Sequence, residues 1–154
     1  MDIIELKERE DISEDLKLSR TYLQFELLLK ELRKKELPQT TGDFVNQNIE
    51  DLNATSLAGN ELRKSIKQKQ TGILNLLEKE HKIVPKNHYQ NLWLALGLCV
   101  FGLPLGIIFG SCMDNMGMLG IGLPVGMAVG VCLGAWLDKK ACKEGKQLDV
   151  EIKY

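Results

Sequence analysis

Residues 102–110 read GLPLGIIFG and residues 122–130 read GLPVGMAVG, so the chain contains nearly the same nine residues twice. Glycine recurs at every fourth position in both copies. These glycines are Gly102, Gly106, Gly110, Gly122, Gly126 and Gly130. In an α-helix a spacing of four keeps residues on one face. The repeat therefore predicts two helices, each with a face that carries no side chains.

The repeat lies inside a long apolar stretch. From Leu92 to Leu137 the only charged residue is Asp114, and this stretch holds ten of the fourteen glycines. A membrane-spanning helix needs about 20 mainly apolar residues, so we expect two spans at about 92–113 and 118–137, joined by a turn at 114–117. The alternative is a glycine-rich core of a soluble protein, but neither half shows the polar face of such a helix.

The two spans are expected to pack as a transmembrane hairpin over 88–138. Folding the chain about residue 116 pairs Gly110 with Gly122, Gly106 with Gly126 and Gly102 with Gly130, and Gly134 extends the second stripe. Backbones that meet without side chains gain dispersion and weak Cα–H···O contacts.

Two further features of the spans concern their shape and their contacts. Pro104 and Pro124 each remove a backbone amide, which predicts a kink in each span. Gly97, Gly117 and Gly120 lie off the main glycine lines. This surplus of glycine predicts close packing on more than one face, and therefore a homo-oligomer.

Positive charge and aromatic residues gather at one end of the expected spans. Lys86 precedes the first span, Lys139 and Lys140 follow the second, and the turn contains neither Lys nor Arg. The positive-inside rule then places both chain ends in the cytoplasm. The aromatic residues at the same boundary are Tyr89, Trp93 and Trp136. We expect a two-pass protein of the plasma membrane, which in a bacterium is the inner membrane.

The segment after the second span, 139–154, is expected to be a charged cytoplasmic tail. Its closing LDVEIKY alternates apolar and polar residues, which leaves open a short strand or disorder.

Over Gly97–Gly134 the chain resembles the glycine-zipper membrane proteins, whose spans carry G-x-x-x-G-x-x-x-G and associate through it. Small bacterial two-span proteins look like this, as do some pore-forming proteins. The resemblance covers about a quarter of the chain. It implies close helix contact in membrane lipid, and it implies nothing about residues 1–90.

Residues 1–87 predict a cytoplasmic domain of two helices, at about 13–37 and 43–83. Ser13, followed by two acidic residues, is typical of an N-cap. Pro38 ends the first helix, and PQTTG (38–42) is expected to be a linker. The second pattern is weakened by glycine and polar residues, so it predicts either one long helix or a break near Gly59. We expect an antiparallel helical hairpin, in an all-α protein.

Apolar residues of the first helix recur at steps of four and three, which places them on one face. They are Leu18, Tyr22, Phe25, Leu29 and Leu32. The first interpretation of this face is burial against the second helix. The second is contact with another chain, either a copy in a coiled coil or a cytoplasmic protein, because so few residues form a thin core.

The chain lacks the residue patterns of catalysis. It contains no phosphate-binding loop, no G-x-S-x-G and no paired acidic motif, so we expect no enzyme activity. Its four cysteines form no C-x-x-C pair, and no metal site or cofactor is predicted. A net charge of −1 argues against a nucleic-acid partner. Asp114, in the turn, is the candidate residue for the mouth of an oligomeric pore.

Two functions are compatible with these patterns. The first is a small integral membrane protein that self-associates through its glycine faces and presents a cytoplasmic helical interaction domain, as an anchor or scaffold. The alternative is an oligomeric pore-forming or membrane-disturbing protein that the helical domain gates. The absence of a polar stripe in the spans favours the anchor.

Overall fold

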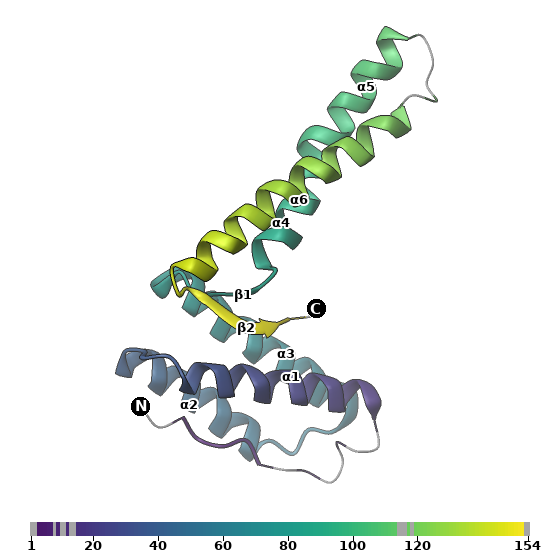
Figure 1. Ribbon diagram of the computed structural model, residues 1–154. Helices are drawn as coiled ribbons and strands as arrows, with labels where there is room; N and C mark the ends of the chain where they lie inside the picture. The colour runs from purple at the N-terminus through teal and green to yellow at the C-terminus, as the bar shows by residue number, and fades with distance from the viewer. Residues whose placement is uncertain are drawn as a thin grey trace. The chain divides into compact units, whose positions relative to one another are not determined.

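The computed structural model describes residues 3–7, 9, 12, 15–113, 117 and 119–152, and most of these residues are helical (Figure 1). The expected all-α class is confirmed at that level. The chain forms two compact units. One contains residues 1–85 together with 148–154, and the other contains residues 86–147.

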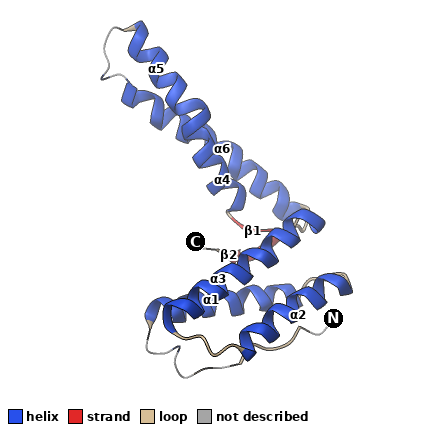
Figure 2. Cartoon of the chain, turned by 180° about the vertical axis from the view of Figure 1, so that it is seen from behind, coloured by secondary structure: helices blue, strands red, loops and turns tan. Residues whose placement is uncertain are grey.

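The described part of the first unit contains three α-helices, where the sequence predicted two. Figure 2 shows how they are arranged within the unit. They are α1 (Leu16–Arg33), α2 (Gln39–Ala54) and α3 (Gly59–Leu76), and α3 continues into a π-helical turn, Leu77–His81. α3 packs against both α1 and α2. The alternative of one long helix over 43–83 is therefore wrong, because this stretch breaks at residues 55–58.

The start of α1 depends on Asp15. Its carboxylate accepts hydrogen bonds from the amides of Lys17 at 2.8 Å and Leu18 at 3.4 Å. These amides have no partner within the helix, so a side-chain acceptor stabilises its first turn. Ser13, to which the sequence assigned this role, lies outside the described residues.

The PQTTG segment, expected to be a linker, contains the start of α2. Pro38 precedes the helix, and the Gly42 amide donates to the Pro38 carbonyl at 3.2 Å. Proline suits this place because the first residues of a helix do not use their amides within it. Thr41 is buried, and its Oγ1 lies 2.8 Å from Nε2 of His81. This segment is therefore part of the packed unit.

A residue far away in the sequence binds the segment between α2 and α3. The guanidinium of Arg9 donates to the carbonyls of Thr55 at 3.1 Å and Leu57 at 3.0 Å. Gly59 then enters α3 with a φ of +55°, a left-handed conformation that glycine adopts readily. Of the two alternatives that the sequence left open, the structure therefore shows the break.

Two short strands pair into a two-stranded sheet. They are β1 (Val84–Lys86) and β2 (Gln147–Glu151). Leu148, Val150 and Ile152 are buried in the core of the first unit. The segment expected to be a charged tail, 139–154, is thus folded over much of its length, because a helix continues to Lys143 and residues beyond it join a core. Of the two alternatives for the closing residues, the strand is present.

The second unit is a pair of long helical segments. The first runs through α4 (His88–Gly97), a π turn (Leu98–Gly102) and α5 (Leu103–Cys112), and the second is α6 (Leu119–Lys143). The stretches His88–Cys112 and Gly120–Lys143 are long and apolar enough to cross a membrane. Only 17% and 22% of their apolar windows are buried. A core helix of a soluble protein would be mostly buried, so this low burial argues against that alternative.

Candidate functional site

In the apolar part of the second unit, the buried residues are glycines. Among the described residues between 92 and 137, the buried ones are Gly97, Gly102, Gly106, Gly110, Gly122, Gly126, Gly130 and Gly134. Large apolar side chains point outward instead, and those of Val100, Ile107 and Ile108 are 56%, 57% and 54% exposed. In a soluble helix pair the large apolar side chains would meet at the contact. We name the contact between these glycines the glycine seam.

The two backbones approach so closely along the glycine seam that no side chain fits between them. A Cβ atom added to Gly122 would lie 2.3 Å from the amide nitrogen of Gly106. One added to Gly126 would lie 2.4 Å from the amide nitrogen of Gly102. Real Cβ contacts essentially never fall below 3.0 Å. Glycine is therefore required at these positions of α6 by direct contact with backbone.

The close contact between backbones continues toward the start of α4, but it does not include every glycine of α6. A Cβ added to Gly130 would lie 2.2 Å from the carbonyl oxygen of Trp93, and one added to Gly134 would lie 2.5 Å from Cα of Gln90. In contrast, a Cβ added to Gly120 would meet nothing within 4 Å. Gly120 is thus a glycine on the same helix that the contact does not require.

The register of the glycine seam differs from the predicted one by a helical turn. The sequence paired Gly106 with Gly126, whereas the structure places Gly106 against Gly122 and Gly126 against Gly102. A shift of four residues keeps the same faces in contact. Periodicity alone therefore does not choose between the two registers, and the predicted one is wrong.

Gly97 lies in the glycine seam, although its spacing of five residues from Gly102 placed it off the line in the sequence. The π turn accounts for this difference, because the Leu103 amide bonds to the Leu98 carbonyl five residues back. Such a turn takes up one residue more than an α-helical turn, so Gly97 returns to the face of Gly102. Pro104, which has no amide to donate, follows directly.

The two prolines lie outside the glycine seam. Pro104 and Pro124 are both exposed, and Pro124 is inside α6. The kinks expected at these positions stay predictions.

Asp138 holds the start of α4, and sequence reasoning missed it. It is 7% exposed, and its carboxylate accepts hydrogen bonds from the amides of Tyr89 at 3.1 Å and Gln90 at 2.9 Å. The residue before α4, Asn87, makes no side-chain cap. A carboxylate from α6 thus caps α4 and faces the positive end of its dipole. The available signal was its position four residues after Gly134, in line with the glycine stripe.

Several of the residues predicted to lie at the membrane interface are close to Asp138 or to the start of α4 in the sequence. The Lys140 ammonium lies 5.9 Å from the centre of the Trp136 ring, and the rings of His88 and Tyr89 meet edge to face at 5.3 Å. Lys86 and Lys139 are exposed. Ammonium groups and amphipathic rings therefore occur together at this end of the helix pair, a combination that suits a membrane–water boundary.

Further along the same end, Lys146 lies 2.8 Å from the Glu144 carboxylate and holds the pKa of that carboxyl below its usual value.

The α1 residues considered for partner binding lie in the core of their own unit. Leu18, Phe25, Leu29 and Leu32 are at most 2% exposed, and the Tyr22 hydroxyl donates to the Lys7 carbonyl. The structure therefore assigns this stripe to internal packing, the first of its two interpretations. The exposed leucines of the same helix are Leu16, Leu23 and Leu27.

Asp114, the candidate for a pore mouth, lies outside the described residues. Within the described part of the chain, no group of three or more His, Cys, Asp or Glu residues is placed to hold a metal ion.

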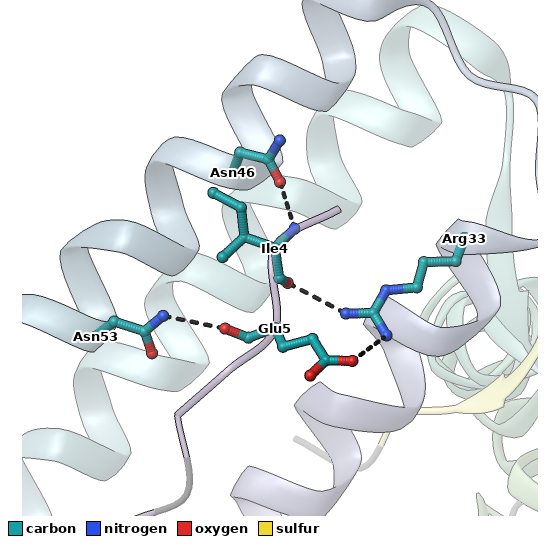
Figure 3. Close-up of polar contacts among 5 residues, drawn as sticks. All are labelled: Ile4, Glu5, Arg33, Asn46 and Asn53. Atoms are coloured by element: carbon teal, nitrogen blue, oxygen red, sulfur yellow. Dashed lines mark hydrogen bonds and ion pairs between the residues drawn. The ribbon is translucent and has the colours of Figure 1, made fainter. Parts of the chain in front are cut away.

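Residues 3–7 form a segment that we name the N-terminal strap. Asn53 of α2 binds its main chain twice: Oδ1 accepts from the Lys7 amide at 2.9 Å, and Nδ2 donates to the Glu5 carbonyl at 3.1 Å. Seven residues earlier, Oδ1 of Asn46 accepts from the Ile4 amide at 3.0 Å. Two asparagines on one face of α2 thus hold a non-helical segment, as Figure 3 shows.

The other side of the N-terminal strap is held by α1. Arg33 donates from Nη2 to the Ile4 carbonyl at 3.2 Å, and its Nη1 lies 3.7 Å from the Glu5 carboxylate (Figure 3). No signal in the sequence marked these contacts, and the sequence predicted no helix or strand before residue 13.

Comparison of the chain with family models, curated proteins and solved structures finds no match.

Proposed function

We propose that the protein is a two-pass integral membrane protein whose spans anchor a helical unit at the cytoplasmic surface. The burial pattern of the second unit carries the proposal. Its large apolar side chains point outward, where water would solvate them poorly and hydrocarbon solvates them well. Lipid provides no hydrophobic force between the two helices. Close backbone contact at the glycine seam then stabilises the hairpin.

The proposed orientation places both chain ends in the cytoplasm. Lys86, Lys139 and Lys140 lie at one end of the helix pair, with Trp136 and Tyr89. Lysine is enriched on the cytoplasmic side of membrane spans, and amphipathic rings prefer the boundary. Both unit boundaries of the chain, at residues 85 and 148, then fall on that side.

We infer an anchor or scaffold rather than a pore. Among the described residues from 89 to 112 and from 120 to 137 no ionisable Asp, Glu, Lys, Arg or His occurs, and channels usually retain one. Eight of the ten glycines between residues 92 and 137 are buried within a single copy, and Gly97, one of the three that suggested oligomeric contact, is among them. Self-association stays part of the proposal, and it would use the outward faces, for example around Gly120.

Membrane insertion and orientation are tested together in intact cells. Alkaline carbonate should leave the protein in the membrane pellet. With the native cysteines replaced, a cysteine at Asn115 should react with an impermeant thiol reagent and one at Lys146 should stay protected. Extraction by carbonate contradicts insertion, and the reverse labelling pattern contradicts the orientation.

The pore alternative and self-association have separate tests. The purified protein should carry no current in planar bilayers under conditions in which a known pore former conducts, and a steady channel current would favour the pore. Native mass measurement in detergent should give more than one copy per complex. A monomer at all protein concentrations would remove self-association from the proposal and leave the anchor.

A further inference from the structure

The N-terminal strap is held through its main chain. Its Ile4, Glu5 and Lys7 backbone groups all bond to side chains of α1 or α2. Side chains that form hydrogen bonds with backbone groups can bind any segment that presents these groups at the same spacing. The surface around the strap is therefore built to receive an extended peptide, and it does not depend on strap side chains for most of its contacts.

Asn53 imitates a neighbouring β-strand. A residue of a parallel strand accepts from one amide of its partner and donates to the carbonyl two residues earlier. The Asn53 side-chain amide makes the same two bonds, to the Lys7 amide and the Glu5 carbonyl. Helix α2 thereby offers a strand-like edge to the strap, although it contributes no strand.

Three side chains of the strap indicate which sequences the surface favours. Ile3 is buried at 7% exposure, and Leu6 packs partly against the same core. Between them Glu5, which is largely exposed, pairs with Arg33. The surface therefore fits the pattern apolar-x-acid-apolar, as Ile3-Ile4-Glu5-Leu6 presents it.

The strap is weakly held in comparison with the helices around it. Its bonds to Asn46, Asn53 and Arg33 are exposed to water, where a hydrogen bond contributes about 0.5–1.5 kcal/mol. Only Ile3 among its described side chains is buried. A segment with so few buried contacts can open without unfolding the remainder.

Space remains beside the strap. A cavity of about 580 Å³ lies between it and α1, lined by Glu5, Leu6, Lys7, Tyr22, Glu26, Leu29, Lys30 and Arg33. This cavity leaves room for an incoming side chain larger than Leu6.

We propose that this surface, the strap groove formed by Asn46, Asn53 and Arg33, binds an extended apolar-x-acid-apolar segment of a cytoplasmic partner protein. The N-terminal strap occupies the strap groove in cis and competes with the partner. A short tether gives such a segment an effective concentration of about a millimolar, so the partner binds tightly only when the strap is released. The inference rests on the proposed anchor function in one respect: it names the partner of the anchored unit.

The test uses a fluorescein-labelled peptide with the sequence of residues 1–9, MDIIELKER, and the full-length protein in detergent micelles. Ile4→Pro in the protein removes the backbone N–H that donates a hydrogen bond to Oδ1 of Asn46. It leaves the strap groove intact, because Ile4 lies on the surface. We expect fluorescence anisotropy to show that this variant binds the peptide about tenfold or more tightly than wild type, because the competing strap is weakened.

Second substitutions in the Ile4→Pro protein locate the peptide. Asn53→Ala should return the affinity to the wild-type level or below, because two main-chain contacts are lost. Asn48→Ala is the matched control on the same helix, because Asn48 bonds to the Phe44 carbonyl and to Lys69 and to no strap group among the described contacts. This variant should leave peptide affinity unchanged. A labelled peptide that itself carries Ile4→Pro should bind weakly to every variant.

Several outcomes overturn the proposal. Equal affinity of wild type and Ile4→Pro, with helix content retained by circular dichroism, shows that the strap does not compete. Unchanged affinity after Asn53→Ala shows that the peptide binds elsewhere. A rise in complex mass for Ile4→Pro without peptide assigns the strap groove to a second copy rather than a separate partner. None of these outcomes bears on carbonate extraction or thiol labelling, which test the anchor separately.

Discussion

At the scale of single residues, the glycines of α6 are not equivalent. A Cβ at Gly126 would lie 2.4 Å from backbone and cannot be relieved by a rotamer change, whereas Gly120 has open space. Gly102 is intermediate, because a Cβ there would keep 3.4 Å from the nearest atom. The cost of an added methyl group should therefore follow these distances and not the G-x-x-x-G pattern.

We predict that Gly126→Ala destabilises the helix pair by about 1–3 kcal/mol, because the backbones must separate to admit the methyl group. Gly120→Ala, the matched control, should lie within about 0.5 kcal/mol of wild type, and Gly102→Ala should fall between the two. Unfolding in mixed detergent micelles, followed by circular dichroism, measures the differences. An equal loss for Gly126→Ala and Gly120→Ala would show that the glycine seam does not form.

Asp138 is the second decisive residue. Asp138→Ala should cost about 0.5–2 kcal/mol, because the Tyr89 and Gln90 amides lose their acceptor. Hydrogen exchange at these two amides should accelerate, while exchange in the middle of α6 stays unchanged. Asp138→Asn keeps one acceptor oxygen and should give a smaller effect. Unaltered exchange at both amides in the alanine variant would contradict the cap.

At the scale of elements, the π turn sets the rotation of α4 relative to α5. It inserts one residue between Gly97 and Gly102, and one residue corresponds to about 100° of rotation in a helix of 3.6 residues per turn. Without it, α4 would present a different face to α6. The turn and Pro104 belong together, because the wider turn accommodates a residue that has no amide.

Single-residue deletions test this role of the π turn. In a Pro104→Ala background, deletion of Val100 leaves three residues between Gly97 and Gly102, which restores the glycine spacing of four. A regular α-helix then keeps the glycine seam, and stability should change little. Deletion of Ile107, which is exposed to the same extent, shifts the glycines on either side of it out of line. We expect a loss of about 1–3 kcal/mol for that deletion in micelles. Equal tolerance of both deletions would contradict the assigned register.

The sequence predicted some of these elements and not others, for identifiable reasons. Spacing of four and the absence of charge were sufficient to predict two apolar helices and the faces that meet. They do not distinguish registers one turn apart, and they assume 3.6 residues per turn throughout, so the π turn and Gly97 were missed. Asp138 was missed because its partners are backbone amides, so only its position four residues after Gly134 marked it in the sequence.

The strap groove was unpredictable for the same reason. Asn46 and Asn53 bind main chain about 40 or more residues away, and an asparagine on a helix surface has no distinctive neighbours in the sequence. The break between α2 and α3 was visible as an alternative at Gly59. The guanidinium of Arg9, which binds two carbonyls of this break, was not.

At the scale of the whole molecule, the first unit is completed by both ends of the described chain. Its three helices form a small core, and small domains bury a limited share of their surface. Ile3 from the N-terminal strap and Leu148, Val150 and Ile152 from the C-terminal segment add to this core. The first unit therefore contains chain that is synthesised only after both apolar helices, so its folding should finish late.

Leu148→Ala tests whether the C-terminal segment stabilises the distant helices. Leu148 has 0% exposure, and truncating a fully buried leucine costs about 2–5 kcal/mol through lost transfer energy and a residual cavity. Hydrogen exchange should therefore accelerate across α1, α2 and α3, although these helices end more than 60 residues earlier. Leu133→Ala, in the exposed face of α6, is the control and should leave that exchange unchanged because its side chain lies outside the first core. Protection of α1 to α3 that is insensitive to Leu148→Ala would mean that the three helices fold without the strand.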